Sequence, residues 1–475
     1  MQTDLYIDGN WVPSQSAQRF DVMNPATEDV IASVASADIF DADLALNAAS
    51  IAMQEWAARS PRDRSEVLRK AWELMTARLP EFARLITLEN GKANADAMGE
   101  ANYAAEFFRW FAEEAVRVDG LISHAPASGA RIIVQHKPAG IAVLVTPWNY
   151  PAAMGTRKIA PALAAGCAVI IKPASETPLT MLALMPLLEE AGVPKGVVNV
   201  LPSRNTGVLV DHMLHDPRVR VVSFTGSTEV GRKLLHSAAD QILKPAMELG
   251  GNAPAIVFED ANLDVAVEGV MLAKMRNLGE ACTAANRIYV HSSIAPAFTE
   301  KFTSAMAELK IGNGLEAGID VGPLVNSDTR NKVDAFVQDA VAKGAKVELG
   351  GVLPTGKGFF YPPTVLSGVP ETADCVGDEI FGPVAALQVF NDQEDVIRRA
   401  NDTEYGLVAY VFSEDMKRAL QVCERLDYGM VGLNRGLVSD PAAPFGGTKQ
   451  SGLGREGGHE GMHEFMETQY ISASW

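Results

Sequence analysis

The chain has 475 residues, of which 47% are hydrophobic and 21% charged, proportions that are ordinary for a folded globular protein. They exclude a long disordered chain, a collagen and a coiled coil, and the length predicts about three domains. The 59 acidic and 41 basic side chains give a net charge of -18, which argues against a broad surface for nucleic acid or for an anionic membrane.

The N-terminal segment MQTDLYIDGNW has neither the basic nor the apolar part of a secretory signal, and no apolar run approaches the ~20 residues of a membrane span. The cysteines are far apart and form no CxxC pair or Cys/His cluster: Cys167, Cys282, Cys375 and Cys423. This pattern predicts neither a disulfide framework nor a structural zinc. We therefore expect a cytoplasmic protein without a membrane partner, whose thiols are either buried or reactive.

Residues 41–120 are predicted to be helical, because Leu68, Trp72, Met75 and Leu79 recur at helical spacing among charged residues. The segment 131–136 is predicted to be a strand that interrupts this helical region.

From residue 141 onward, short apolar runs alternate with helical stretches. The predicted strands cover 141–145, 168–171, 197–201, 219–224 and 246–249, and the predicted helices cover about 152–165, 178–191, 206–214 and 228–238. Strands that are apolar throughout and alternate with helices predict a parallel sheet that is covered on both faces. A dinucleotide or phosphate ligand would bind at the carboxyl ends of these strands.

A second α/β segment is predicted from about 250 to 447. Its predicted strands cover 255–258, 288–290, 384–390 and 408–412. The segment 468–472 is predicted to be one more strand. Like the strand at 131–136, it would be exposed unless it is paired, so we expect pairing between subunits.

Gly452, Gly454 and Gly457 match the pattern G-x-G-x-x-G of dinucleotide-binding loops. No hydrophobic strand precedes this segment, and too few residues follow it for a βαβ unit. We interpret it as a glycine-rich turn.

Three side chains near strand ends and turns suit one reaction. Asn149 follows the strand at 141–145, and its amide can donate to a developing oxyanion or cap the next helix. Glu248 precedes two glycines, where partial burial would raise its pKa for work as a general base; the alternative is a solvated turn glutamate. Cys282 follows a glycine-rich turn and is a candidate nucleophile. The alternative is a buried structural cysteine, which is also our interpretation of the other three.

Two signals point to a cofactor. Lys172 lies at a strand end and can reach ribose hydroxyls, unless it is a solvated surface lysine. Gly226 and Ser227 precede a helix whose first backbone N–H groups can hold a pyrophosphate, unless Ser227 is only a helix cap.

Together these segments resemble the aldehyde dehydrogenase superfamily over nearly the whole chain. The resemblance is carried, in order and spacing, by TPWNYP, GCAVIIKPASETP, SFTGSTEVG, MELGGNAP, NLGEACTAANR, EIFGP and PFGGTKQSGLGREGG. Within the superfamily the chain is most similar to the succinate-semialdehyde dehydrogenases, through FFRWFAEEAVRVDG, TPWNYPAAMGTRKIAPALAAGC and RNLGEACTAANRIYV.

The resemblance implies an α/β fold with a Rossmann-type parallel-sheet cofactor domain, an α/β catalytic domain and a small β oligomerisation element. The implied boundaries are 1–117 and 139–247 for the NAD(P)-binding domain, 248–447 for the catalytic domain, and 118–138 and 448–475 for the oligomerisation element. A homodimer or homotetramer is implied, joined through the 131–136 hairpin region and the C-terminal strand.

The resemblance also implies a mechanism. Cys282 attacks the aldehyde as a thiolate, while the Asn149 amide and the Cys282 backbone N–H hold the oxyanion. After hydride transfer to the nicotinamide, Glu248 activates the water that hydrolyses the thioester. The implied contacts with NADP or NAD come from Thr146, Trp148, Lys172, Ser175, Gly226, Ser227, Leu249, Glu379 and Phe381.

The distal carboxylate of the substrate is implied to bind Arg157, Arg276 and Ser439, because a guanidinium suits a carboxylate. Otherwise the two arginines lie on helix surfaces. The expected function is the NAD(P)-dependent oxidation of succinate semialdehyde, or of a similar carboxylated aldehyde, to the dicarboxylate.

Three alternatives remain. The first is oxidation of uncharged aliphatic or aromatic aldehydes by the same mechanism. The second is a CoA-acylating dehydrogenase, which the presence of the hydrolytic base Glu248 disfavours. The third is a catalytically silent binding or structural protein on this scaffold, which the intact set of Cys282, Glu248 and Asn149 argues against.

The chain departs from the family pattern at three positions. Glu280 replaces the usual Gln, and a carboxylate there would disfavour the thiolate unless a cation offsets it. Ala284 stands where some relatives have a Cys, so we predict no vicinal disulfide with Cys282. Ser175 stands where NAD-preferring enzymes often have Glu. Because a hydroxyl can accept a 2′-phosphate that a carboxylate repels, we predict that NADP is used at least as well as NAD.

Overall fold

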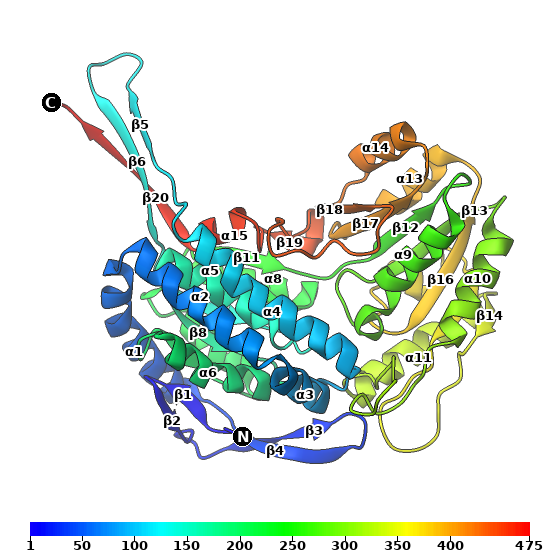
Figure 1. Cartoon of the computed structure of the whole chain (residues 1–475), viewed down its shortest axis with the longest axis horizontal. Coiled ribbons are helices and arrows are strands. Elements are labelled where there is room, and N and C mark those ends of the chain that lie inside the picture. The colour runs from blue at the N-terminus through cyan, green and yellow to red at the C-terminus, as the bar shows by residue number, and fades with distance from the viewer.

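The computed structural model describes residues 1–475 and arranges them as two sheet-centred lobes from which a narrow arm projects (Figure 1). The larger lobe holds an eight-stranded sheet in the order β19 (Gly452–Leu453), β11 (Lys244–Glu248), β10 (Val219–Thr225), β7 (Ile141–Val145), β8 (Ala168–Lys172), β9 (Val198–Val200), β1 (Leu5–Ile7) and β2 (Asn10–Val12). The strands from β11 to β9 are parallel, which confirms the predicted parallel sheet. β19, β1 and β2 pair antiparallel at its edges.

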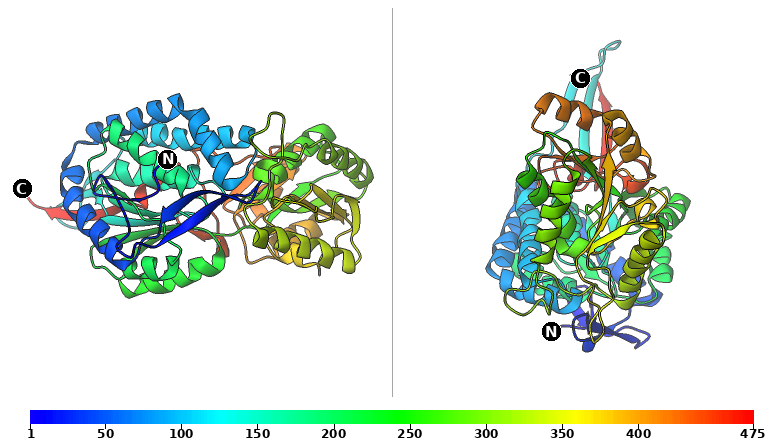
Figure 2. Two further views of the ribbon diagram at one scale, coloured as in Figure 1. Left: turned by 90° about the horizontal axis from the view of Figure 1, so that it is seen from below. Right: turned by 90° about the vertical axis from the view of Figure 1, so that its right-hand side faces the viewer.

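Helices cover both faces of this sheet (Figure 2). Successive residues of β7 point to opposite faces, so Ile141 and Val143 join one core cluster while Ala142 and Leu144 join the other. The first cluster is completed by α1 (Ile39–Ala58), α7 (Thr206–Leu214) and α8 (Thr228–Asp240). The second is completed by α2 (Pro61–Ala77), α3 (Leu79–Asn90), α4 (Asn94–Glu114), α5 (Ala153–Ala165) and α6 (Leu179–Ala191).

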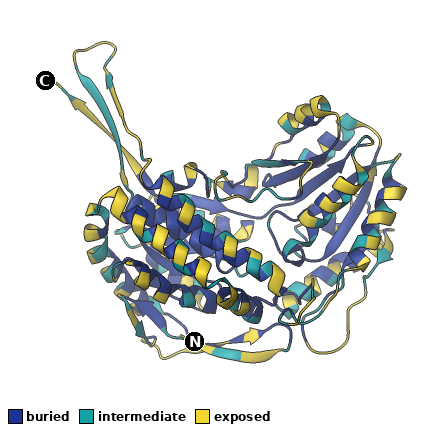
Figure 3. Cartoon of the chain, viewed as in Figure 1, coloured by how far each residue is buried: buried dark blue, intermediate teal, exposed yellow.

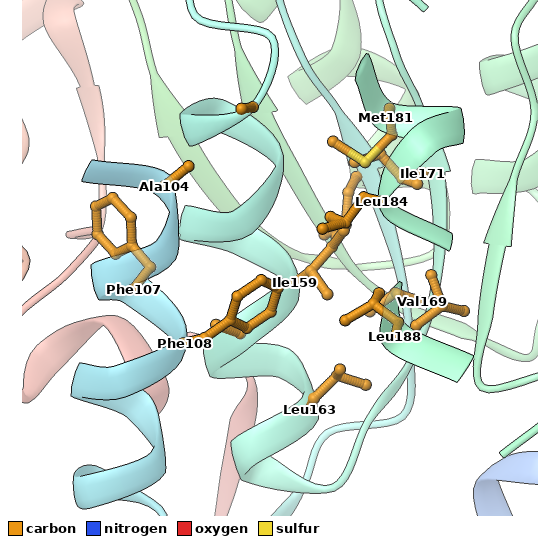
Figure 4. Packing of buried hydrophobic residues seen from close by; sticks show 14 of the residues in the cluster. Ala104, Phe107, Phe108, Ile159, Leu163, Val169, Ile171, Met181, Leu184 and Leu188 are labelled. Carbon is orange, nitrogen blue, oxygen red and sulfur yellow. The ribbon is translucent and has the colours of Figure 1, made fainter. Parts of the chain in front are cut away.

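Helix α5 lies at the centre of the second cluster. Ile159 and Leu163 of α5 pack between Phe108 of α4 and the side chains of β8 and α6 (Figure 4). All 13 residues of α5 are buried, so this helix has no face toward solvent. A charged residue of α5, such as Arg157, must therefore find its partners inside the protein.

The smaller lobe holds a seven-stranded sheet in the order β14 (Lys346–Leu349), β15 (Thr364–Ser367), β16 (Val384–Phe390), β13 (Ala285–His291), β12 (Ala253–Val257), β17 (Val408–Phe412) and β18 (Met430–Leu433). The four predicted strands are the central ones, from β16 to β17. The unpredicted β14, β15 and β18 have four residues each and lie toward the two edges, where so short a segment shows no clear pattern. The helices of this lobe are α9 (Leu263–Met275), α10 (Ala295–Ala307), α11 (Ser327–Ala342), α12 (Asp374–Gly377), α13 (Gln393–Asn401) and α14 (Met416–Arg425).

The arm is a three-stranded antiparallel sheet in the order β20 (Met466–Ala473), β6 (Arg131–Pro138) and β5 (Leu121–His124). The predicted strands at 131–136 and 468–472 are thus confirmed, and they pair with each other along eight positions. Figure 3 shows the two lobe sheets as buried and the arm as exposed or half-buried. The arm therefore keeps two open edges, one on β20 and one on β5.

The remaining elements connect these parts. A two-stranded ribbon, β3 (Arg19–Asn24) with β4 (Asp29–Ala35), runs beneath both lobes in Figure 1, and we did not predict it. Short helices lie at η1 (Arg276–Gly279), η2 (Lys449–Ser451) and α15 (Glu460–His463). No helix combines the length and the apolar character that crossing a membrane requires.

The division of the chain into domains remains a prediction. Within the segment 448–475, which we assigned to the oligomerisation element, β19 lies in the eight-stranded sheet beside β11 rather than in the arm.

Candidate active site

The order of the strands opens a crevice at the carboxyl edge of the larger sheet. From β7 the chain adds β8 and then β9 on one side, and β10 and β11 follow on the other side of β7. The connections after β7 and β10 therefore leave in opposite directions, which is where ligands bind in open α/β sheets. Thr146 to Asn149 follow β7, and Gly226 and Ser227 follow β10.

A cavity of about 260 Å³ lies at this crevice and extends toward the smaller lobe. It gathers most of the predicted site residues from distant parts of the chain: Trp148, Asn149, Arg157, Gly226, Ser227, Glu248, Leu249, Arg276, Cys282, Glu379, Phe381 and Ser439. Thr146, Lys172 and Ser175 do not line it. Thr146 donates its backbone N–H to the carbonyl of Lys172 at 3.2 Å, so these residues lie together at the neighbouring strand ends.

Cys282 differs from the other cysteines in its surroundings. It is half-buried and lines the cavity, on the loop between η1 and β13, whereas Cys167 and Cys375 are fully buried in the core clusters. Burial and the neighbouring Glu248 carboxylate raise the pKa of its thiol well above the usual range, and Arg157 acts in the opposite direction. All four cysteines are free thiols.

A glycine shortly after Glu248 allows the loop that carries Cys282 to lie close to the backbone there. A side chain on Gly251 would place its Cβ only 2.4 Å from the carbonyl oxygen of Cys282. Gly251, three residues after Glu248, is therefore required for the contact between this segment and the loop that carries the thiol.

Glu248 is the last residue of β11, and its side chain is 2% exposed. Neither carboxylate oxygen has a hydrogen-bond partner. Burial raises its pKa to about 7, although the Arg157 guanidinium, 3.7 Å from Oε2, favours the charged form. Glu248 is therefore not a solvated turn residue, and its pKa suits proton transfer near neutral pH.

Asn149 is held against the loop of the thiol. Its Nδ2 donates to the carbonyl oxygen of Glu280 at 3.0 Å, and α5 takes no side-chain cap from it. Asn277 strengthens this contact, because its Nδ2 donates both to the carbonyl of Asn149 at 3.0 Å and to that of Glu280 at 2.9 Å. The two predicted oxyanion donors, the Asn149 amide and the Cys282 N–H, thus belong to segments that Asn277 joins.

We did not single out Asn277 from the sequence. It adopts a left-handed conformation with φ 50°, followed by Leu278 with φ 43°. An Asn in a glycine-containing turn is a usable signal for such a conformation, because Asn adopts it more readily than most residues, although it does not reveal the two carbonyls that the side chain binds.

Glu280 lies outside the cavity that holds the thiol. Its Oε1 accepts a hydrogen bond from the backbone N–H of Val325 at 3.1 Å, and the side chain does not line the cavity. Burial raises its pKa well above the usual range, which favours the neutral form of the carboxyl.

Arg157 is buried and takes part in an ion-pair cluster. Its Nε lies 2.5 Å from Oε2 of Glu456, and Lys158 pairs with the other oxygen of that carboxylate. The alternative of a helix-surface arginine is therefore wrong for this residue. Glu456 was missed in the sequence, because it is separated from Lys158 by 298 positions and only the tertiary fold brings them together.

Arg276 has no carboxylate within ion-pair distance, although it lines the same cavity. Its Nε donates to the hydroxyl of Tyr150 at 3.0 Å, and its Nη2 lies 3.5 Å from Oγ of Ser439. A half-buried guanidinium beside a hydroxyl, without an acidic partner, suits a carboxylate that enters with a ligand.

The strand ends beside the cavity fit a dinucleotide. Lys172 is 4% exposed and has no acidic partner within ion-pair distance, and burial lowers its pKa to about 8. Arg204, which follows β9 and which we did not predict, adds a second positive charge near it. Thr225 Oγ1 lines the cavity without a hydrogen-bond partner, and Ser227 caps α8 through the N–H of Val230. Cations, an unpaired hydroxyl and a helix N-terminus match the ribose and phosphate groups of NAD(P).

Glu379 and Phe381 also line the cavity. Glu379 Oε1 accepts from the N–H of Gly251 at 3.3 Å, and burial raises the pKa of this carboxyl to about 7. The Phe381 ring meets the Trp148 ring edge-on at 5.3 Å. These groups would face the nicotinamide half of a bound cofactor.

The glycine motif at 452–457 is not a dinucleotide-binding loop. Gly452 and Leu453 form β19, which pairs antiparallel with the end of β11. The interpretation as a glycine-rich segment without a βαβ unit agrees with this position.

Comparisons with known proteins agree with this arrangement. The family model "Aldehyde dehydrogenase family" matches residues 11–471. A succinate-semialdehyde dehydrogenase of Paenarthrobacter nicotinovorans is 52% identical over 442 residues, which cover 93% of this chain and 98% of that protein. A glutarate-semialdehyde dehydrogenase of Pseudomonas putida is 48% identical over 471 residues, which cover 99% of this chain and 97% of that protein. The crystal structure of an NADP-dependent enzyme of E. coli superposes with a TM-score of 0.98 at 44% identity and covers 100% of this chain and 98% of that one.

Proposed function

This chain belongs to the aldehyde dehydrogenase family, and on that premise we propose that it oxidises succinate semialdehyde, or a closely homologous semialdehyde, to the dicarboxylate. The observation that carries the proposal is Arg276. It is a guanidinium without an acidic partner, beside Ser439, in the cavity that holds Cys282. The two relatives are named as dehydrogenases of succinate semialdehyde and glutarate semialdehyde, which supports a substrate with a distal carboxylate.

In this proposal Cys282 Sγ bonds to the aldehyde carbon as a thiolate, and the positive charge of Arg157 favours that thiolate. The Asn149 amide and the Cys282 backbone N–H stabilise the negative charge that develops on the carbonyl oxygen. The oxidation needs a hydride acceptor, which a bound NAD(P) would supply at the cavity lined by Glu379 and Phe381. Glu248 then takes a proton from water as the water oxygen bonds to the thioester carbon, and the C–S bond breaks to release the acid and restore Cys282.

We also propose that NADP is used at least as well as NAD. Lys172 and Arg204 supply positive charge, and Ser175 Oγ supplies a hydroxyl that now donates to Glu176 at 3.2 Å. A 2′-phosphate would be attracted by these cations, and no carboxylate stands at position 175 to repel it. The NADP dependence of the superposed E. coli enzyme is in keeping with this.

We further propose a homodimer or homotetramer that is joined through the arm, and a location in the reducing cytoplasm. The open edges of β5 and β20 support the first proposal. The four free thiols, one of them placed for chemistry, support the second.

Steady-state kinetics test the substrate proposal. Succinate semialdehyde, glutarate semialdehyde, butanal and benzaldehyde are compared with both cofactors, for the wild-type chain and for Arg276→Gln. We expect a preference for the carboxylated aldehydes. In the variant we expect the KM for succinate semialdehyde to rise about 10- to 100-fold, because a hydrogen bond to a charged group is lost. The KM for butanal should change little. Equal effects on both aldehydes, or a wild-type preference for the uncharged ones, would favour the rival function.

A further inference from the structure

Tyr103 carries a buried hydroxyl that nothing in the protein satisfies. It lies in α4, and its phenol oxygen is enclosed without a hydrogen-bond partner. The side chain lines the catalytic cavity and also a second cavity of about 200 Å³ beside it. Three further residues line both cavities, Tyr150, Arg276 and Ser439, so Tyr103 belongs to the wall where Arg276 and Ser439 meet.

Helix packing explains this position. Figure 4 shows α4, with Ala104 and Phe107, lying alongside α5 with Ile159. Tyr103 precedes Ala104 and Arg157 lies half a turn before Ile159, so the two packed helices bring both side chains to the same cavity. The phenol ring is held in place by the Phe107 ring, whose centroid lies 4.8 Å away.

The chemistry of the neighbours indicates what the hydroxyl can bind. Burial raises the pKa of the Tyr103 phenol, so the group is a protonated O–H, while Arg157, which can donate a hydrogen bond to the phenol oxygen, and Arg276 act in the opposite direction. Because a guanidinium cannot accept, the phenol proton is left without an acceptor. Guanidinium groups have only donors, whereas a carboxylate offers two oxygens and about four acceptor positions. Arg157 is already paired with Glu456, and the carboxylates Asp96 and Glu100 line only the second cavity. The Tyr103 hydroxyl and Arg276 are therefore donors without an acidic partner on the catalytic cavity, where they suit an anion.

We propose that Tyr103 is a third ligand of the substrate's distal carboxylate, donating its phenol O–H to the group that Arg276 and Ser439 bind. This rests on the proposed oxidation of a carboxylated aldehyde and names a specificity-determining residue for it. An unpaired buried hydroxyl is unfavourable in the free protein, so its satisfaction by the carboxylate adds to the preference over an uncharged aldehyde.

The test is Tyr103→Phe, which removes the hydroxyl and keeps the ring. Tyr361→Phe is the matched control, because the Tyr361 hydroxyl is also inside the fold but bonds to Asp334 at 3.1 Å, and the residue lines no part of the cavity. We expect Tyr103→Phe to raise the KM for succinate semialdehyde and the inhibition constant of succinate about 10-fold or more. The kcat and KM for butanal should stay close to the wild-type values, and Tyr361→Phe should change neither substrate's constants.

A second measurement separates ligand binding from a structural role. Because the hydroxyl has no partner in the free protein, Tyr103→Phe should not lower the melting temperature, but the rise in melting temperature that succinate produces should shrink. An equal rise of KM for both aldehydes, or a lower melting temperature with an unchanged succinate effect, would overturn the proposal.

The outcomes also distinguish this inference from the proposed function. A wild-type preference for butanal over succinate semialdehyde would refute the function and the inference together. Suppose instead that the wild-type chain prefers the semialdehyde, that Arg276→Gln abolishes this preference and that Tyr103→Phe leaves it intact. This result would refute only the role of Tyr103, and would mean that the hydroxyl faces water in the complex.

Discussion

Among the residues of the cavity, Glu248 shows most clearly how burial sets chemistry. Its carboxylate ends a buried strand and has no hydrogen-bond partner, so its pKa rises to about 7. Below that pH it is protonated and cannot take a proton from water; above it the carboxylate is free to do so.

We predict that kcat rises with pH through about 7. In Glu248→Gln this rise should disappear from the pH profile and kcat should fall about 10²- to 10⁴-fold, because the amide cannot act as a base. Intact-protein mass spectrometry after mixing with substrate and cofactor should show an acyl group that remains on Cys282 in the variant. Glu379→Gln is the control, since Glu379 has a similar pKa but lies beside the proposed cofactor site, and this variant should accumulate no acyl-enzyme. A Glu248→Gln variant without acyl-enzyme and with normal turnover would contradict the role.

Arg204 permits a second prediction at this scale. We predict that Arg204→Gln weakens NADP binding about three- to tenfold and leaves NAD binding almost unchanged, because only NADP carries the 2′-phosphate. The dissociation constants are measured without aldehyde, by protein fluorescence, at low salt. Arg220→Gln is a matched control, because Arg220 is an exposed arginine near the amino end of β10, away from the carboxyl edge of the sheet. An equal loss of affinity for both cofactors would contradict the prediction.

At the scale of elements, the glycine motif at 452–457 gains a structural purpose. Its first residue, Gly452, pairs with Glu248 in the β11–β19 ladder and has φ 136°. A Cβ at this position would lie 2.0 Å from the carbonyl oxygen of Met247. The close approach of β19 to β11 therefore requires glycine, and it helps to hold the strand end that carries Glu248.

We predict that Gly452→Ala lowers the melting temperature and reduces kcat at least about tenfold, since the backbone of β11 must shift and a misplaced catalytic group can cost as much as 10²-fold. Gly207→Ala is the control, because a Cβ on Gly207 in α7 meets nothing within 4 Å. Gly207→Ala should be neutral or slightly stabilising. A fully active and stable Gly452→Ala variant would show that β19 does not hold Glu248.

At the scale of the whole molecule, the arm is the most exposed part of the fold. It carries large apolar side chains on its surface, with Ile122 73% and Tyr470 59% exposed. Open strand edges together with exposed apolar residues are typical of a surface that another copy of the chain covers.

We predict that the double variant Ile122→Lys, Tyr470→Lys lowers the molar mass measured by light scattering after size-exclusion chromatography, because charges would be buried in the interface. Val352→Lys is the control, since Val352 is equally exposed, at 73%, but belongs to the smaller lobe. An unchanged mass for the double variant, or a wild-type chain that is monomeric, would exclude assembly through the arm.

Charge is also organised at this scale. The net charge of -18 opposes anionic ligands, yet Arg276 in the cavity and Lys172 at the strand ends beside it have no acidic partner within ion-pair distance, whereas Arg157 is paired with Glu456. Composition alone describes the average field of the molecule. The fold thus leaves two unpaired cations where an anionic substrate and cofactor would bind.

The sequence by itself determined the parallel sheet and the residues at its strand ends. The apolar runs at 141–145 and 168–171 are local patterns, and any residue that follows such a strand lies at the carboxyl edge of the sheet. For this reason Asn149 and Lys172 could be assigned to a common edge, and Glu248, at the end of a third strand, could join them. The short strands β14, β15 and β18 escaped prediction because four residues do not establish a period.

Only the tertiary structure decided which side chains meet and which charges they hold. The ion pairs of Glu456 and the hydrogen bond from Asn277 to the carbonyl of Asn149 join segments that lie far apart in the chain. The Tyr103 hydroxyl is unpaired only because of the residues that surround it in the fold. Burial likewise raised the pKa of Glu280 well above its usual range and that of Glu248 to about 7. Such properties depend on desolvation and on long-range contacts, which no local pattern of residues contains.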